Sequence, residues 1–169
     1  MTSGHGLRRL RGVNLGGWLV LEKWMSPSLF AGLAATDETT FCAELGRDAG
    51  RRLRAHWQRW IGREDFLWLA ERGINAVRIP VGHWILGPPY PFHPVYGSSP
   101  HPFVEGGIDV LDAAMRWARE AGLGVLLDLH AAPGCQNGFD NGGIKDVCDW
   151  HTQDEYVDFS VELLGRLAA

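Results

Sequence analysis

The sequence has few cysteines and no long apolar run. Its three cysteines, Cys42, Cys135 and Cys148, are an odd number without disulfide-like spacing, which favours free thiols, with one Cys135–Cys148 bridge as the alternative. No run approaches the roughly 18 apolar residues of a membrane span. No apolar segment accompanies the arginines of residues 1–11, as a signal peptide requires. We therefore expect no membrane partner, and the composition leaves the compartment undetermined.

Phosphate-binding and metal-binding patterns are also missing. No Gly-rich turn of the dinucleotide or P-loop kind follows a strand-like segment, and residues 12–17 resemble one only superficially. The net charge of −4 disfavours a surface that tracks nucleic-acid phosphates. None of the histidines has a zinc-like spacing with a cysteine pair, including those in or near expected loops, His83, His93, His101, His130 and His151. We expect no nucleic-acid partner, no metal and no cofactor.

The length limits the possible folds. The chain has 169 residues, of which 46% are hydrophobic and 21% charged, a composition that supports a folded core. A closed eight-stranded α/β barrel typically needs about 250 residues. No internal repeat or low-complexity linker divides the sequence. We therefore treat residues 1–169 as one portion of a single domain.

Short apolar runs alternate with longer amphipathic stretches, which is typical of β-α-β units around a parallel sheet. Strands are expected at 10–15, 74–81 and 125–129, the last two of them buried. Helices are expected at 41–60, 63–72, 108–120 and from about 154 onwards, with Gly73 and Gly122 ending the second and third. A long loop connects 82 to 106. The pattern predicts about three strand-helix units, too few to close a barrel.

Polar residues gather where these strands end, the edge at which parallel α/β folds place their binding groups. Glu22 lies between two tryptophans, and is either a ligand for sugar hydroxyls or an exposed loop carboxylate. Arg78 lies within the second strand, where burial requires a carboxylate or carbonyl partner, either in a core ion pair or in a site. His130 ends the third strand and fits a core or a site role equally. Asp128 is expected to support the backbone.

The loop at 132–143 places amides, a carboxylate and an aromatic ring between glycines that permit unusual backbone angles. Together with RGVNLGGWLVLE (11–22), VRIPVG (77–82) and DLHAAPGCQNGFDN (128–141), it resembles glycoside hydrolase family 5, and most closely its exo-β-1,3-glucanase branch. The similarity extends from about residue 11 to 158. It implies the N-terminal part of a (β/α)₈ TIM barrel.

The resemblance also implies roles for individual residues. Arg78 would lie beside the catalytic nucleophile and help to keep it ionised, and His130 would line the −1 sugar subsite. Glu22 would bind hydroxyls of the terminal glucose. Phe139 would stack on a sugar ring, and Asp140 and Asn141 would shape the cleft. The implied partner is a β-glucan or oligosaccharide substrate, and members of the family are often secreted.

The family hydrolyses glycosides with retention through two glutamates, an acid/base and a nucleophile, whose carboxyl groups lie about 5 Å apart. They follow the fourth strand, in an Asn-Glu-Pro motif, and the seventh. The sequence contains no Asn-Glu pair, so we expect both glutamates beyond residue 169 and an inactive chain. We also expect self-association through an open sheet edge. The alternatives are a non-catalytic carbohydrate-binding protein and an endo-acting β-glucanase or mannanase of the same family.

Overall fold

The computed structural model describes residues 9–87 and 102–169. Its strands and longer helices are, in chain order, β1 (Gly12–Asn14), α1 (Glu38–Leu45), α2 (Ala49–Trp60), α3 (Arg63–Glu71), β2 (Ala76–Gly82), α4 (Gly107–Ala121), β3 (Gly124–Ala131) and α5 (Asp154–Leu167). The strands form one parallel sheet in the order β1-β2-β3. The expected α/β class with three strands is confirmed. The expectation for residues 1–8, and those for His93 and His101, fall outside the described residues.

The elements differ from the expected ranges in three places. The single helix expected at 41–60 is two helices, because Gly46 adopts a φ of 51° and ends α1. The first strand is shorter than 10–15. The third strand is not buried as expected: Val125 and Leu127 pack against the core, whereas Leu126 on the opposite face is 62% exposed. The strand is therefore covered on one face only at this position.

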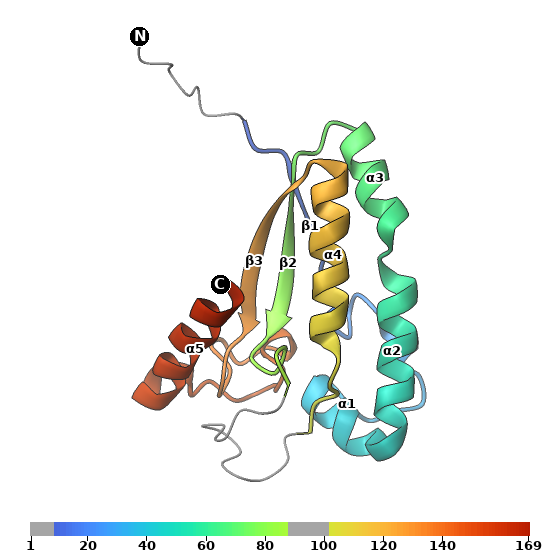
Figure 1. Cartoon of the computed structure of the whole chain (residues 1–169). Helices are drawn as coiled ribbons and strands as arrows, with labels where there is room; N and C mark the ends of the chain where they lie inside the picture. The colour runs from blue at the N-terminus through green and yellow to red at the C-terminus, as the bar shows by residue number, and fades with distance from the viewer. Residues whose placement is uncertain (1–8, 88–101) are drawn as a thin grey trace.

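The helices are arranged in layers around the sheet. Helices α2, α3 and α4 lie together on one side, and α5 lies beyond β3 on the other (Figure 1). Val77, Ile79 and Val81 of β2 are buried in the same core as Leu111 and Ala114 of α4. The loops that follow the strands gather near α1, at the carboxyl edge of the sheet (Figure 1). This is the edge where the sequence predicts the site.

Pro80 occupies an unusual place, the middle of the central strand. Proline cannot donate to a sheet ladder and is normally confined to edges and strand ends. The amide of Leu15 donates to the carbonyl of Arg78, so the backbone groups of Arg78, and two residues later those of Pro80, point toward β1. Because β1 ends at Asn14, no strand residue of β1 lies opposite Pro80 to accept a backbone hydrogen bond from that position. The short first strand and the proline therefore fit each other.

Asn75 joins the amino ends of the strands. Its amide donates to the carbonyl of Arg11 (3.0 Å), and its side-chain oxygen accepts from the amide of Arg11 (2.8 Å). Its carbonyl accepts from the amide of Gly124, which begins β3 (2.9 Å). These bonds fix the relative heights of the three strands, and so of the residues at their carboxyl ends.

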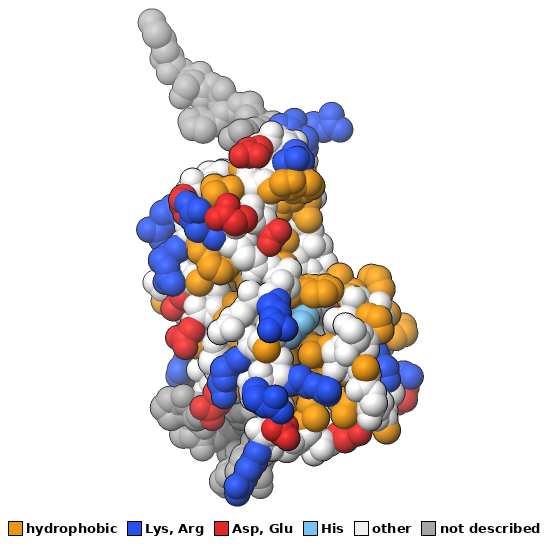
Figure 2. All heavy atoms as spheres, turned by 90° about the vertical axis from the view of Figure 1, so that its right-hand side faces the viewer, with side chains coloured by type: hydrophobic (Ala, Val, Ile, Leu, Met, Phe, Trp, Pro, Cys, Tyr) orange, Lys and Arg blue, Asp and Glu red, His pale blue; other side chains and the backbone are white. Residues whose placement is uncertain are grey.

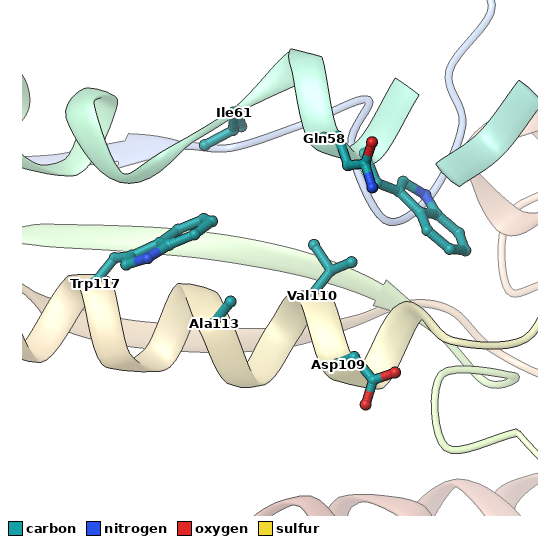
Figure 3. A pocket seen from close by; sticks show the side chains of 7 residues that line it. Gln58, Ile61, Asp109, Val110, Ala113 and Trp117 are labelled. Carbon is teal, nitrogen blue, oxygen red and sulfur yellow. The ribbon is translucent and has the colours of Figure 1, made fainter. Parts of the chain in front are cut away.

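The outer helices carry a mixed surface. Figure 2 shows the side of the molecule that is on the right in Figure 1, where basic and acidic side chains are interspersed with apolar ones. A hollow of about 280 Å³ lies between α2 and α4, lined by Trp57, Gln58, Ile61, Asp109, Val110, Ala113 and Trp117 (Figure 3). Among the described residues, no helix has the length and apolar character needed to cross a bilayer.

Glu38, in the first turn of α1, is a buried carboxyl with 1% of its surface exposed. Its Oε2 accepts from the amide of Leu21 (2.9 Å), and its side chain is hydrogen-bonded to Trp84. The pKa of Glu38 is raised from 4.5 to about 8, chiefly by burial and to a smaller extent by the neighbouring Asp37, while these two hydrogen bonds oppose the shift. The carboxyl is therefore protonated in the folded chain at neutral pH.

Glu38 makes the stability of the chain depend on pH. Below pH 4.5 the carboxyl is protonated in both states, whereas between 4.5 and about 8 only the unfolded state releases the proton. The free energy of unfolding should therefore fall as the pH rises through this window, with a limiting slope of about 1.4 kcal/mol per pH unit. Glu38→Gln should remove this contribution when urea unfolding is measured at pH 5 and pH 8.

The control is Glu44→Gln, at an exposed position on the same helix. It removes an exposed carboxylate and keeps the buried one. Its free energy of unfolding should therefore fall with rising pH as in the unmodified chain. If the free energy of unfolding depends on pH equally in Glu38→Gln and in the unmodified chain, Glu38 is not the source of the pH dependence.

Candidate active site

Arg78 lies in the central strand and is partnered from both neighbouring strands. Its Nη1 donates to Asn14 Oδ1 at the end of β1 (2.9 Å), and its Nη2 lies 2.6 Å from Asp128 Oδ2 on β3. The register explains these contacts, because Asn14 pairs with Arg78 and Asp128 pairs with Pro80. The side chain is one-third exposed, so the guanidinium is only partly buried. An arginine cannot release its charge, and this strand position therefore depends on the neighbouring carboxylate.

His130 adds a second polar group to the same cluster. Its Nδ1 lies 2.9 Å from Asp128 Oδ2 and 3.0 Å from Arg78 Nη2. One ring nitrogen cannot donate to Asp128 and accept from Arg78 at the same time. A guanidinium can only donate, and its contact with Nδ1 has hydrogen-bond geometry, so Nδ1 accepts from Arg78 and Nε2 carries the ring proton. Asp128 pairs with the charge of Arg78 and lies beside the His130 ring, so it is a member of the cluster beyond the backbone support expected of it.

Glu22 follows β1 and is buried, with 7% of its surface exposed, so the exposed-loop alternative is wrong. Its Oε2 accepts from Trp24 Nε1 (3.1 Å), while the Trp24 side chain itself is 73% exposed. A Cβ placed on Gly16 would lie 3.1 Å from Asn14 Nδ2 and 3.2 Å from Glu22 Oε1. Both polar groups therefore flank Gly16, which brings Glu22 close to the Arg78 cluster.

Helix α2 holds the Gly16–Gly17 turn from outside. Trp60 Nε1 donates to the carbonyl of Gly16 (3.0 Å), and His56 Nε2 lies 2.7 Å from the carbonyl of Gly17. Burial lowers the pKa of His56, which favours the neutral ring, and its bond to Gly17 opposes the shift. The Gly16–Gly17 turn, which precedes Glu22, is therefore fixed to the helical layer.

The loop after β3 supplies the remaining expected residues. Phe139 is 65% exposed, and its amide donates to Asn137 Oδ1 (3.0 Å). Asn137 Nδ2 donates to Asn141 Oδ1 (3.1 Å), and the amide of Asn141 donates to Asp140 Oδ1 (3.1 Å). Asp140 Oδ2 accepts from the amide of Lys23 (3.3 Å), which joins this loop to the Glu22 segment. A ring presented on such a network is a ready surface for stacking.

The structure thus brings Arg78, His130 and Glu22 to one edge of the sheet, and it links Asp140 to the same place. No role in the site was expected of Asn14 or Asp128, although both lie where expected strands end. Glu38 was missed because nothing in its local sequence distinguishes a buried glutamate at a helix start from an exposed one.

The cysteines do not form a second site. The thiols of Cys42, Cys135 and Cys148 are free, so the Cys135–Cys148 bridge is not formed. Burial, together with the neighbouring Glu38, raises the pKa of Cys42 to about 12, which makes it an inert thiol. Across residues 9–87 and 102–169, no group of three or more His, Cys, Asp or Glu side chains is placed to hold a metal ion.

Known proteins resemble this chain over most of its length. No protein-family model matches it. It is 47% identical over 162 residues to a probable glucan 1,3-beta-glucosidase A of Aspergillus fumigatus, which is 94% of this chain and 36% of that protein. It is 49% identical over 148 residues to the protein of the same name from Aspergillus niger, which is 86% of this chain and 33% of the relative. The chain therefore spans about a third of the length of the curated relatives it matches.

A solved structure shares the fold of this chain. The crystal structure of rutinosidase from Aspergillus niger superimposes with a TM-score of 0.78 at 24% sequence identity. The match covers 94% of this chain and 43% of the rutinosidase. The chain is thus similar, over most of its length, to about a third of proteins named glucan 1,3-beta-glucosidase, and it has the fold of part of a rutinosidase.

Proposed function

We propose that the chain is the sugar-binding part of a family 5 glycoside hydrolase that releases glucose from the ends of β-1,3-glucan. One observation carries the proposal: the Arg78–Asp128–His130 cluster lies at the carboxyl edge of a parallel sheet, and its partner Asn14 flanks Gly16 together with Glu22. Carboxylates and exposed aromatic rings together suit a sugar, because one binds hydroxyl groups and the other its C–H face. The names of the relatives agree with a β-glucan substrate.

Each residue would act through the contacts described above. The Glu22 carboxylate accepts one hydrogen bond from Trp24, and its other acceptor sites would bind hydroxyls of a terminal glucose. His130 would donate from Nε2 to a sugar hydroxyl, because its Nδ1 accepts from Arg78. Phe139 would stack on a sugar ring, with Asp140 and Asn141 fixing the loop that presents it. No cofactor takes part in this recognition.

Catalysis would require residues that the chain does not supply. We propose that later strands complete a (β/α)₈ barrel and bring two glutamates to this edge, about 5 Å apart. One would protonate the leaving oxygen while the other attacks the anomeric carbon, and water would then release glucose with retained configuration. Arg78, the permanent cation of the cluster, would favour the ionised form of the attacking carboxylate.

We also propose that the 169-residue chain associates with itself in isolation. Leu126 on β3 is 62% exposed, and Val161 and Leu164 on α5 are 66% and 42% exposed. Sedimentation velocity over a range of concentrations should detect species larger than a monomer, and Leu126→Lys should reduce them, because a charge opposes burial of that face. A monomer that melts cooperatively at all concentrations would contradict this proposal.

Glucose release from laminarin tests the activity. The 169-residue chain should be inactive, whereas the product of the same reading frame extended to its next stop codon should release single glucose units. Longer oligosaccharides as first products would instead indicate an endo-acting enzyme. Sugar binding without hydrolysis in both forms would favour a non-catalytic carbohydrate-binding protein, and activity of the short chain would overturn the placement of the glutamates.

Two substitutions test the sugar contacts in the extended form. Glu22→Gln should weaken laminaribiose binding by about tenfold or more, because bonds to a charged acceptor are worth about 1.5–3 kcal/mol. Phe139→Ala should weaken it by about fivefold through loss of stacking. The matched controls on α5, Glu155→Gln and Val161→Ala, should leave the dissociation constant from calorimetry unchanged. Equal losses in the controls would assign the effects to stability.

A further inference from the structure

The first turn of α1 lies between the two loops that carry the expected sugar contacts. Asp37 is the N-cap of this helix, and Glu38 and Thr39 are its first residues. Asp37 and Glu38 are almost fully buried, with 2% and 1% of their surfaces exposed. None of the three was expected from the sequence to have a role. We call residues 37–39 the α1 clamp.

On one side, the α1 clamp holds the segment that carries Glu22. Glu38 Oε2 accepts from the amide of Leu21, the residue directly before Glu22 (2.9 Å). Glu38 is also hydrogen-bonded to Trp84, whose ring packs against Gly82 and Gly143. A buried carboxyl is costly, so its place here indicates a requirement for an acceptor at this amide.

On the other side, the α1 clamp holds the segment that follows Phe139–Asn141. The amide and the hydroxyl of Thr39 both donate to the carbonyl of Gly143, at 3.0 and 2.6 Å. Asp37 Oδ2 accepts from the amide of Lys145 (3.1 Å). The positive φ of Gly143, 84°, allows the turn that presents its carbonyl to Thr39.

These contacts exceed what the start of a helix requires. Asp37 Oδ1 alone completes the N-cap, by accepting from the amide of Thr40 (2.7 Å). The first amides of a helix lack partners within it and are commonly satisfied by water. Here the amide of Thr39 and the second oxygen of Asp37 are both used on the distant loop, 104 and 108 residues away.

We infer that the α1 clamp is a positioning element that sets the spacing between the Glu22 carboxylate and the Phe139–Asn141 loop, and through it the affinity for the end of a β-1,3-glucan. The sugar-affinity part of this inference rests on the proposed function. The three residues act through the two loops and are not placed in contact with sugar.

Thr39→Val tests the α1 clamp in the extended form, because it removes the hydroxyl and keeps the shape of a partly buried side chain. We expect laminaribiose binding to weaken by about fivefold, the effect of one lost hydrogen bond. Amides of residues 143–146 should exchange hydrogen faster, while the melting temperature changes little. Thr39→Ser should restore both properties. Asp37→Asn retains a capping oxygen but presents an amide to Lys145, and it should give the same result as Thr39→Val.

The control is Glu44→Gln, which alters the contacts of α1 with the amides of Ala34 and Ala35 and touches neither sugar-binding loop. It should leave affinity and loop exchange unchanged. Unchanged exchange and affinity in Thr39→Val and Asp37→Asn would overturn the inference. Absence of laminaribiose binding by the unmodified protein would refute the proposed function, and with it the role in affinity, while loop exchange would still decide whether the α1 clamp couples the two loops.

Discussion

The charge of Arg78 is the constraint on which the polar edge of the sheet depends. A guanidinium in the central strand cannot become neutral, so both neighbouring strands must supply acceptors beside it. Asn14 does so from β1 and Asp128 from β3, and the parallel register places both at the required height. Arg78 in turn donates to His130 on β3. The single charge of Arg78 thus accounts for the polar partners on both neighbouring strands.

The loops are fixed to this edge by separate means. Glycine at position 16 permits the close approach of Asn14 and Glu22, since even one methyl group there would crowd both. The α1 clamp and the Lys23–Asp140 contact hold the two loops to each other. The strands therefore set the charged centre of the site, whereas a helix start outside the sheet sets its width. This division allows the loops to be tuned without a change in the charged cluster.

Much of the fold could be predicted from the sequence, because apolar periodicity and glycine stops are local signals. The ranges of α3, α4 and β2 follow from them closely. The break at Gly46 was missed, since apolar spacing continues across it. The exposure of Leu126 depends on which neighbours cover a strand, and no local pattern contains that information. The location of Arg78, His130 and Glu22 at one edge could be predicted from the strand ends that precede or contain them, whereas the contact of Glu38 depends on a partner 17 residues away.

The charged cluster also has a consequence for the order of folding. Its contacts join residues separated by 64 positions, for Asn14 and Arg78, and by 52, for Arg78 and His130. Closing such long loops costs conformational entropy before any stabilising contact forms, whereas a single helix forms through local contacts. The individual helices should consequently form early, whereas the packing of α3 on α4 and the polar edge, which both join distant residues, should form later. Recognition chemistry is thus a late product of folding, and it is the part most easily lost when the chain opens locally.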